Sequence, residues 1–179
     1  MGDFNKLISF FNKIDFQMDV DRFEDRLIAQ KIACFIQLKG IDLRYPYNLY
    51  IRGPYSRLLA GDYYDHSEEF SDFTSNYRLN NEESQLITKL EGLFHKSPSI
   101  LEIGATYGYL VTCINYTPIN AYIEVKRHKK QFSGKKIAIG VSKAKEFLFE
   151  PSEDDINDLV QETESWQNAG LELIVDGHE

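Results

Sequence analysis

The residue types that most often carry chemistry are scattered along this chain. The four histidines, His66, His95, His128 and His178, have no second ligand at a spacing that binds a metal ion. Zinc and similar ions need three or four donors whose spacing lets them converge on one point. We therefore expect no metal site.

The two cysteines, Cys34 and Cys113, each lie within an apolar run. A disulfide scaffold or a zinc site would need more cysteines at shorter spacing. A nucleophilic cysteine would need an exposed thiol beside a base, and apolar runs disfavour that arrangement. We expect both to be buried free thiols.

The acidic residues and the loops give no enzymatic signature either. Asp62 with Asp65 fits a solvated helix face, and Asp154 with Asp155 stands where a helix N-terminus favours negative charge. The sequence contains neither the Gly-x-x-x-x-Gly-Lys-Ser/Thr nor the Gly-x-Gly-x-x-Gly pattern that cradles phosphates. We therefore predict a protein that is not an enzyme and needs no cofactor.

Side chains suited to recognition gather instead around one predicted turn, in residues 50–59 (YIRGPYSRLL). Gly53 permits backbone angles closed to other residues, Pro54 fixes its own φ, and Ser56 can cap a helix over residues 57–64. Tyrosine and arginine dominate the energetic centres of protein interfaces. The predicted partner-binding residues are Tyr50, Arg52, Gly53, Pro54, Tyr55, Ser56 and Arg57. The alternative is that the two tyrosines are core residues that hold strand to helix.

A second candidate surface is the basic stretch 126–136, which could contact phosphate oxygens or an acidic protein, or be a plain solvated surface. Its candidate nucleic-acid contacts are Lys126, Arg127, Lys129, Lys130, Lys135 and Lys136. This stretch supports the alternative function, a DNA-binding transcriptional regulator. Against that alternative, the helix over residues 57–64 has an acidic end that phosphate would repel.

Composition sets the broad class. The chain has 179 residues, 42% of them hydrophobic, enough for one well-cored domain. Its formal net charge of −8 argues against non-specific coating of nucleic acid. The sequence shows neither a signal peptide nor an apolar run long enough to span a bilayer, so we expect no membrane partner and a cytoplasmic setting.

Hydrophobic periodicity predicts mostly helices, with one extended stretch. Helices are expected over residues 4–14, 19–39 and 57–64, from a cap at Asn80 to residue 95, from a cap at Ser99 over residues 100–112, and from Ser142 to residue 149. Residues 41–51 look extended, and residues 119–125 fit either a strand or a helix start.

The domain organisation follows from this pattern. Gly104 and Gly108 fall on one side of their helix and would let a neighbour approach closely. Residues 1–150 are expected to form one mainly α domain (α+β) with a small β-hairpin or sheet. Residues 151–179 are expected to add an acidic helix and a terminal strand packed on it.

The runs KIACFIQLKG (31–40) and YIRGPYS (50–56) resemble the Panacea (SocA-like) antitoxin-type domain family, and are most similar to its YwgA-type relatives. The resemblance covers residues 22–150 and includes the Glu-rich helix start at 81–83 and the Ser-capped helix over 99–110. It implies a compact, mainly helical domain that acts by protein–protein contact, as an antitoxin or an adaptor. The implied partner is a toxin or a component of a proteolysis system.

Overall fold

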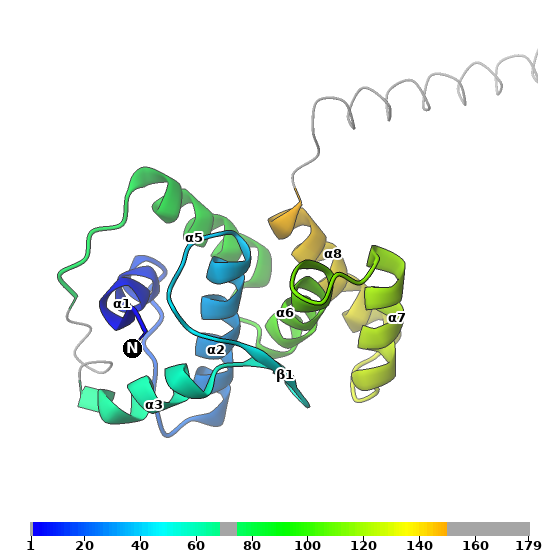
Figure 1. Cartoon of the computed structure of the whole chain (residues 1–179), viewed down its shortest axis with the longest axis horizontal. Coiled ribbons are helices and arrows are strands. Elements are labelled where there is room, and N and C mark those ends of the chain that lie inside the picture. Colours follow the sequence, from blue (N-terminus) through cyan, green and yellow to red (C-terminus); the bar gives the residue numbers. More distant parts are fainter. Residues whose placement is uncertain (1, 69–74, 150–179) are drawn as a thin grey trace, which may run out of the picture. The chain divides into compact units, whose positions relative to one another are not determined.

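Two helices, α2 (Phe23–Leu38) and α6 (Pro98–Thr112), form the centre of the computed structural model, which describes residues 2–68 and 75–149 (Figure 1). Every residue from Leu101 to Leu110 is buried, and so is every residue from Leu27 to Ile36. Helices covered on all sides belong to the core of a protein. The remaining elements are therefore arranged around these two.

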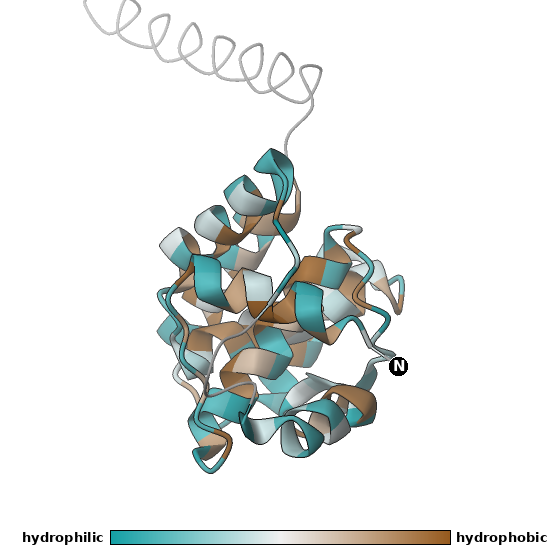
Figure 2. Ribbon diagram, turned by 90° about the vertical axis from the view of Figure 1, so that its left-hand side faces the viewer, coloured by the Kyte–Doolittle hydropathy of each residue, from teal (hydrophilic) through white to brown (hydrophobic). Residues whose placement is uncertain are grey.

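Four further helices pack around the central pair. Helix α1 (Phe4–Lys13) contacts α5 (Asn81–Phe94), whereas α7 (Pro118–His128) and α8 (Gly134–Leu148) contact α6. Hydrophobic stretches gather where these helices meet, and hydrophilic stretches lie toward the outside (Figure 2). Helices α6 and α8 approach closely at Gly104. A Cβ atom at this position would lie 3.1 Å from the Gly140 carbonyl oxygen.

A two-stranded antiparallel sheet interrupts the helices. Strand β1 (Asn48–Tyr50) pairs with β2 (Gly53–Tyr55) in a register that places Tyr50 opposite Gly53. Helix α3 (Arg57–Asp65) follows at once, and the Ser56 hydroxyl accepts a hydrogen bond from the Leu59 amide as predicted. The predicted fold, a mainly helical domain with a small hairpin, is thus confirmed.

Several helix boundaries follow the predicted capping chemistry. Asn80 caps α5 in a capping box. The Asn80 side chain accepts from the Glu83 amide, and the Glu83 side chain accepts from the Asn80 amide. Side-chain caps of this kind contribute about 1 kcal/mol each. Helix α2 starts at Phe23, later than the predicted residue 19, because residues 19–22 form a turn in which the Arg22 amide donates to the Asp19 carbonyl oxygen.

Other boundaries differ from the prediction. Helix α6 starts after Ser97, with Pro98 at its first position, where the missing amide proton and fixed φ suit a helix start. Ser99 was the predicted cap and lies inside the helix. Residues 119–125 are helical because Pro118 likewise takes the first position of α7, and the Thr117 hydroxyl caps the helix by accepting from the Asn120 amide.

The structure corrects the expected cap at Ser142 and the expected burial of Cys113. Helix α8 runs unbroken from Gly134, so Ser142 is in its interior and does not cap a helix. Cys113 is exposed at the end of α6, whereas Cys34 is buried as expected. The expected acidic helix and terminal strand over 151–179 fall outside the described residues.

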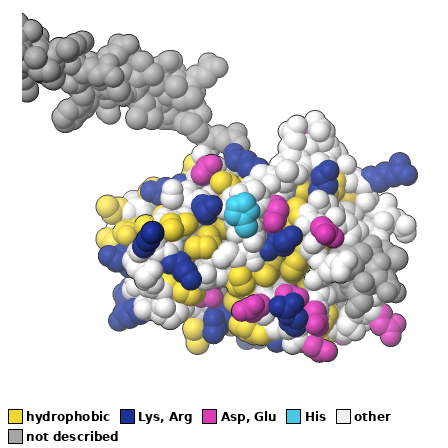
Figure 3. Space-filling model, turned by 180° about the vertical axis from the view of Figure 1, so that it is seen from behind, with side chains coloured by type: hydrophobic (Ala, Val, Ile, Leu, Met, Phe, Trp, Pro, Cys, Tyr) yellow, Lys and Arg dark blue, Asp and Glu magenta, His cyan; other side chains and the backbone are white. Residues whose placement is uncertain are grey.

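The surface mixes charge and apolar groups. Basic and acidic side chains are both spread over the face seen in Figure 3, with hydrophobic side chains between them. Among the described residues, none of the helices has the length and apolar character needed to cross a membrane.

Candidate functional site

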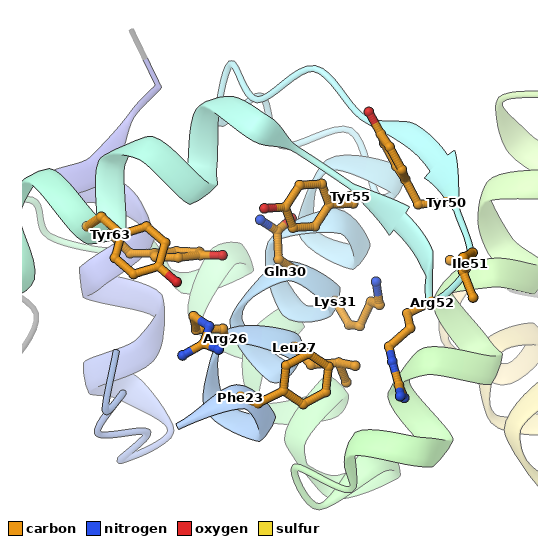
Figure 4. A pocket seen from close by; sticks show the side chains of 12 residues that line it. Phe23, Arg26, Leu27, Gln30, Lys31, Tyr50, Ile51, Arg52, Tyr55 and Tyr63 are labelled. Carbon is orange, nitrogen blue, oxygen red and sulfur yellow. The ribbon is translucent and has the colours of Figure 1, made fainter. Parts of the chain in front are cut away.

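A pocket of about 370 Å³ lies between the first turns of α2, the hairpin and α3 (Figure 4). Helix α2 forms its floor, the hairpin forms one wall, and the tyrosines of α3 form the opposite wall. The lining residues are Phe23, Arg26, Leu27, Gln30, Lys31, Tyr50, Ile51, Arg52, Gly53, Tyr55, Tyr63 and Tyr64.

The lining combines aromatic rings with positive charge. Five of these side chains are aromatic, three are cationic (Arg26, Lys31 and Arg52), and the described lining includes no Asp or Glu. Mostly apolar walls with a few polar groups are typical of ligand-binding pockets of this size. The chemistry of the lining therefore favours an apolar or aromatic group that carries negative charge.

The rim of the pocket exposes large apolar side chains. Ile51, at the tip of the hairpin, is 90% exposed, Tyr64 is 56% exposed and Phe23 is 51% exposed. An isolated exposed hydrophobic residue is ordinary, whereas a group of them around a pocket is typical of an interaction surface.

Helix α2 holds the hairpin through side chains that bond to its backbone. The Ser56 amide donates to Gln30 Oε1 and Gln30 Nε2 donates to the Ser56 carbonyl oxygen, both at 2.9 Å. Lys31 Nζ donates to the Pro54 carbonyl oxygen at 2.6 Å. Side chains of α2 thus take the place of a neighbouring strand along this wall of the pocket.

The turn itself requires glycine. Gly53 has a φ of +85°, and a Cβ built there would lie 2.3 Å from Oγ1 of Thr106 on α6. Both the backbone angle and the close approach exclude a side chain. Gly53 therefore lets the hairpin lie directly against α6.

An ion-pair network holds the hairpin tip from the other side. Lys129 Nζ contacts Oε1 of the buried Glu102 at 2.7 Å and donates to the Ile51 carbonyl oxygen at 2.8 Å. Arg52 reaches the second oxygen of the same carboxylate at 3.5 Å. The two residues between the strands are thus fixed to α6 and to the end of α7.

Burial sets the ionisation of the two lysines. Removal from water lowers the pKa of Lys31 from 10.5 to about 8, because its charged form loses hydration. Burial also lowers the pKa of Lys129, although the bond to Glu102 acts in the opposite direction. Lys31 thus holds its proton less tightly than a solvated lysine while lying in the floor of the pocket.

Cations and rings are stacked along the rim. The Arg52 guanidinium lies 5.0 Å from the centre of the Phe23 ring, and that of Arg57 lies 5.9 Å from the centre of the Tyr50 ring. Tyr50 and Tyr55 meet edge to face at 5.5 Å. Each of the two cation–ring contacts contributes about 0.5–1 kcal/mol at exposed sites.

The predicted partner-binding residues fall into two groups. Tyr50, Arg52, Gly53 and Tyr55 line the pocket, and Arg57 extends the surface by covering Tyr50. Pro54 and Ser56 are buried, and they hold the hairpin without presenting side chains to a partner.

Sequence reasoning missed the part of the site that α2 and α3 contribute. These residues are Phe23, Arg26, Leu27, Gln30, Lys31, Tyr63 and Tyr64, together with Ile51 at the hairpin tip. One signal was present, since Gln30 and Lys31 interrupt an otherwise apolar run of α2.

The basic stretch 126–136 is not one continuous surface. Lys129 is fully buried against Glu102 and is unavailable to phosphate, which corrects the expectation for that residue. Arg127 pairs with Glu124 on its own helix. Of the predicted contacts, five are exposed: Lys126, Arg127, Lys130, Lys135 and Lys136.

Groups suited to covalent or metal chemistry do not converge here. Across residues 2–68 and 75–149, no cluster of three or more His, Cys, Asp or Glu side chains is placed to hold a metal ion. Burial raises the pKa of the Cys34 thiol, which removes the thiolate needed for nucleophilic attack. The arrangement is suited to binding.

Comparisons with family models, with curated proteins and with solved structures give no match to this chain.

Proposed function

We propose that this chain is a non-enzymatic protein-interaction module whose contact surface is the hairpin and the pocket beside it. The observation that carries the proposal is the exposed apolar rim of Ile51, Phe23 and Tyr64 around an aromatic pocket. Binding energy in interfaces concentrates in large aromatic and arginine side chains that surround or fill pockets.

The rigidity of the hairpin supports the same proposal. Its strands are three residues long and would be marginal alone. Lys31 and Lys129 nevertheless bond to its backbone, and Gln30 bonds to the backbone of Ser56, which follows it directly. A surface ordered before binding loses less entropy when a partner arrives. We therefore propose direct docking onto a preformed site.

The finer form of the proposal rests on the resemblance to the Panacea family. It makes the partner a toxin or a proteolysis component; the proposed setting is the cytoplasm. The DNA-binding alternative has less support, because burial of Lys129 leaves one fewer cation available to phosphate.

A site-specific crosslink tests the contact surface. We would place the photoreactive residue p-benzoylphenylalanine at position 51, and in a second protein at position 119, because Ile119 is 69% exposed on α7. After illumination in a nuclease-treated lysate, position 51 should give one defined protein adduct that position 119 does not give.

Competition by substitution completes the test. Ile51→Asp should weaken capture of that partner about tenfold or more, whereas Ile119→Asp should leave it unchanged. Equal crosslinking from both positions, or capture that survives Ile51→Asp, would remove the hairpin from the interface. An adduct that forms in untreated lysate but not in nuclease-treated lysate would favour a nucleic-acid-mediated contact.

A further inference from the structure

The floor of the pocket contains the Lys31 ammonium, which has more hydrogen-bond donors than acceptors around it. Lys31 is 2% exposed, and its ammonium carries three N–H donors. Among the described residues, the Pro54 carbonyl oxygen is its one hydrogen-bond acceptor. A buried charge with unused donors is unfavourable unless another group supplies acceptors.

The neighbouring charges do not balance it. Lys31, Lys129 and Arg52 surround a single carboxylate, Glu102, which already pairs with the latter two. Arg26 adds a further cation to the pocket lining. The electrostatic surroundings of the pocket are therefore positive in excess, and an anion that entered would gain from that excess.

The walls define what must accompany that anion. The pocket beside Lys31 has aromatic and aliphatic surface from Tyr55, Leu27, Phe23 and Tyr63. In Figure 4, Tyr55 lies above the level of Lys31, Leu27 and Phe23 lie below it, and Tyr63 lies farther off on the α3 side. A small inorganic anion would leave this surface uncovered, whereas a purely apolar group would leave the lysine uncompensated. The two features together call for one apolar group next to one carboxylate.

We propose that the pocket receives an aromatic or aliphatic residue of the protein partner together with an adjacent carboxylate, which pairs with Lys31. This inference rests on the proposed function, because it names the chemistry that the partner inserts at the same surface. Arg52, at the mouth, offers the carboxylate a second cation.

Minimal probes test this directly on the full chain. N-acetyl-phenylalanine and N-acetyl-leucine present an apolar side chain beside a carboxylate, and their primary amides have nearly the same shape but are uncharged. Titrations followed by amide chemical shifts should show the free acids binding about tenfold more tightly than the amides. The shifted resonances should come from α2 and the hairpin.

Two variants locate the effect. Lys31→Met should abolish the preference for acid over amide. Lys143→Met should preserve it, because Lys143 also donates to a backbone carbonyl oxygen, that of Leu93, but lies outside the pocket. If Lys31→Met does not fold, the acid-to-amide ratio of the natural protein still decides.

The outcomes separate this inference from the proposed function. Equal binding of acids and amides, or binding of neither at millimolar concentration, overturns the carboxylate site even if position 51 still crosslinks a partner. A preference for acids without any crosslinked partner supports the pocket chemistry and overturns the partner as its source, leaving a free carboxylic acid as the ligand.

Discussion

Gln30 and Lys31 show how single polar residues in a core helix organise the site. Both are buried in α2, and both bond to the backbone of the chain after the hairpin turn. Gln37, two turns further along the helix, pairs in the same way with the amide and carbonyl of Tyr45. Polar residues that interrupt an apolar helix thus form hydrogen bonds to an extended backbone segment, as a neighbouring strand would.

The ionisation of Lys31 should be visible in the pH dependence of stability. The unfolded chain keeps this proton up to a pKa of 10.5, whereas the folded protein releases it near 8. Between these values the unfolded state binds more protons than the folded state. The free energy of unfolding therefore increases as the pH rises. The difference between the natural protein and Lys31→Met should therefore increase by up to about 1.4 kcal/mol per pH unit across that window.

Urea unfolding of both proteins at a series of pH values measures this difference. Using the difference matters because burial raises the pKa of Cys34, which opposes the trend in both proteins. A difference that stays constant from pH 7 to 10 would mean that Lys31 is not desolvated in the folded state.

At this scale the sequence indicates only local chemistry. The turn at Gly53 and the cap at Ser56 are predictable because each depends on its own backbone and the next few residues. The role of Lys31 cannot be predicted in this way, because its acceptor lies 23 residues away. Hydrophobic periodicity indicates only that α2 is a helix. The burial of Lys129 has the same origin, since its carboxylate partner is 27 residues distant.

The hairpin is the element on which the site depends, and its geometry depends on one glycine. Gly53→Ala should destabilise the protein by about 2–4 kcal/mol, from the strain of positive φ together with the collision with Thr106. Gly40→Ala is a matched control, because Gly40 has a φ of +89° but open space around it. It should lose only the strain, about 1–2 kcal/mol.

Denaturant unfolding of the two variants separates strain from collision. Repeating Gly53→Ala in a Thr106→Ala background should recover the excess loss, because the colliding Oγ1 is then absent. Equal losses at positions 40 and 53 would contradict the close packing of the hairpin on α6.

Helix boundaries illustrate what can and cannot be predicted at the element scale. Asn80 was identifiable because a glutamate follows it at the capping-box spacing. Ser97 and Ser99 are equivalent as cap candidates by residue type, and only the preference of Pro98 for the first helical position separates them. The same preference at Pro118 decides that residues 119–125 are helical.

For the molecule as a whole, the Glu102 carboxylate is the point where distant parts of the chain meet. It joins α6 to Lys129 after α7 and to Arg52 in the hairpin, and Lys129 bonds in turn to the Ile51 carbonyl oxygen. Removing one member of a buried ion pair leaves the other charge uncompensated, which typically costs about 3–5 kcal/mol. Glu102→Gln should therefore destabilise the protein by about that amount.

Loss of Glu102 should also loosen the hairpin and so weaken partner capture, although this residue lies outside the pocket lining. A double-mutant cycle tests the coupling: Glu102→Leu with Lys129→Met should be more stable than the sum of the single losses predicts, because neither member of this buried pair is then left as an unpaired charge. Arg52→Met is the control, since the Arg52 side chain is 58% exposed and its ion pair should contribute less than about 1 kcal/mol.

Additive losses for Glu102 and Lys129, or unchanged hydrogen exchange of the hairpin amides in Glu102→Gln, would mean that the hairpin does not depend on this network. Non-additive losses with faster exchange at residues 48–55 would show that one buried carboxylate holds the recognition surface on the helical core.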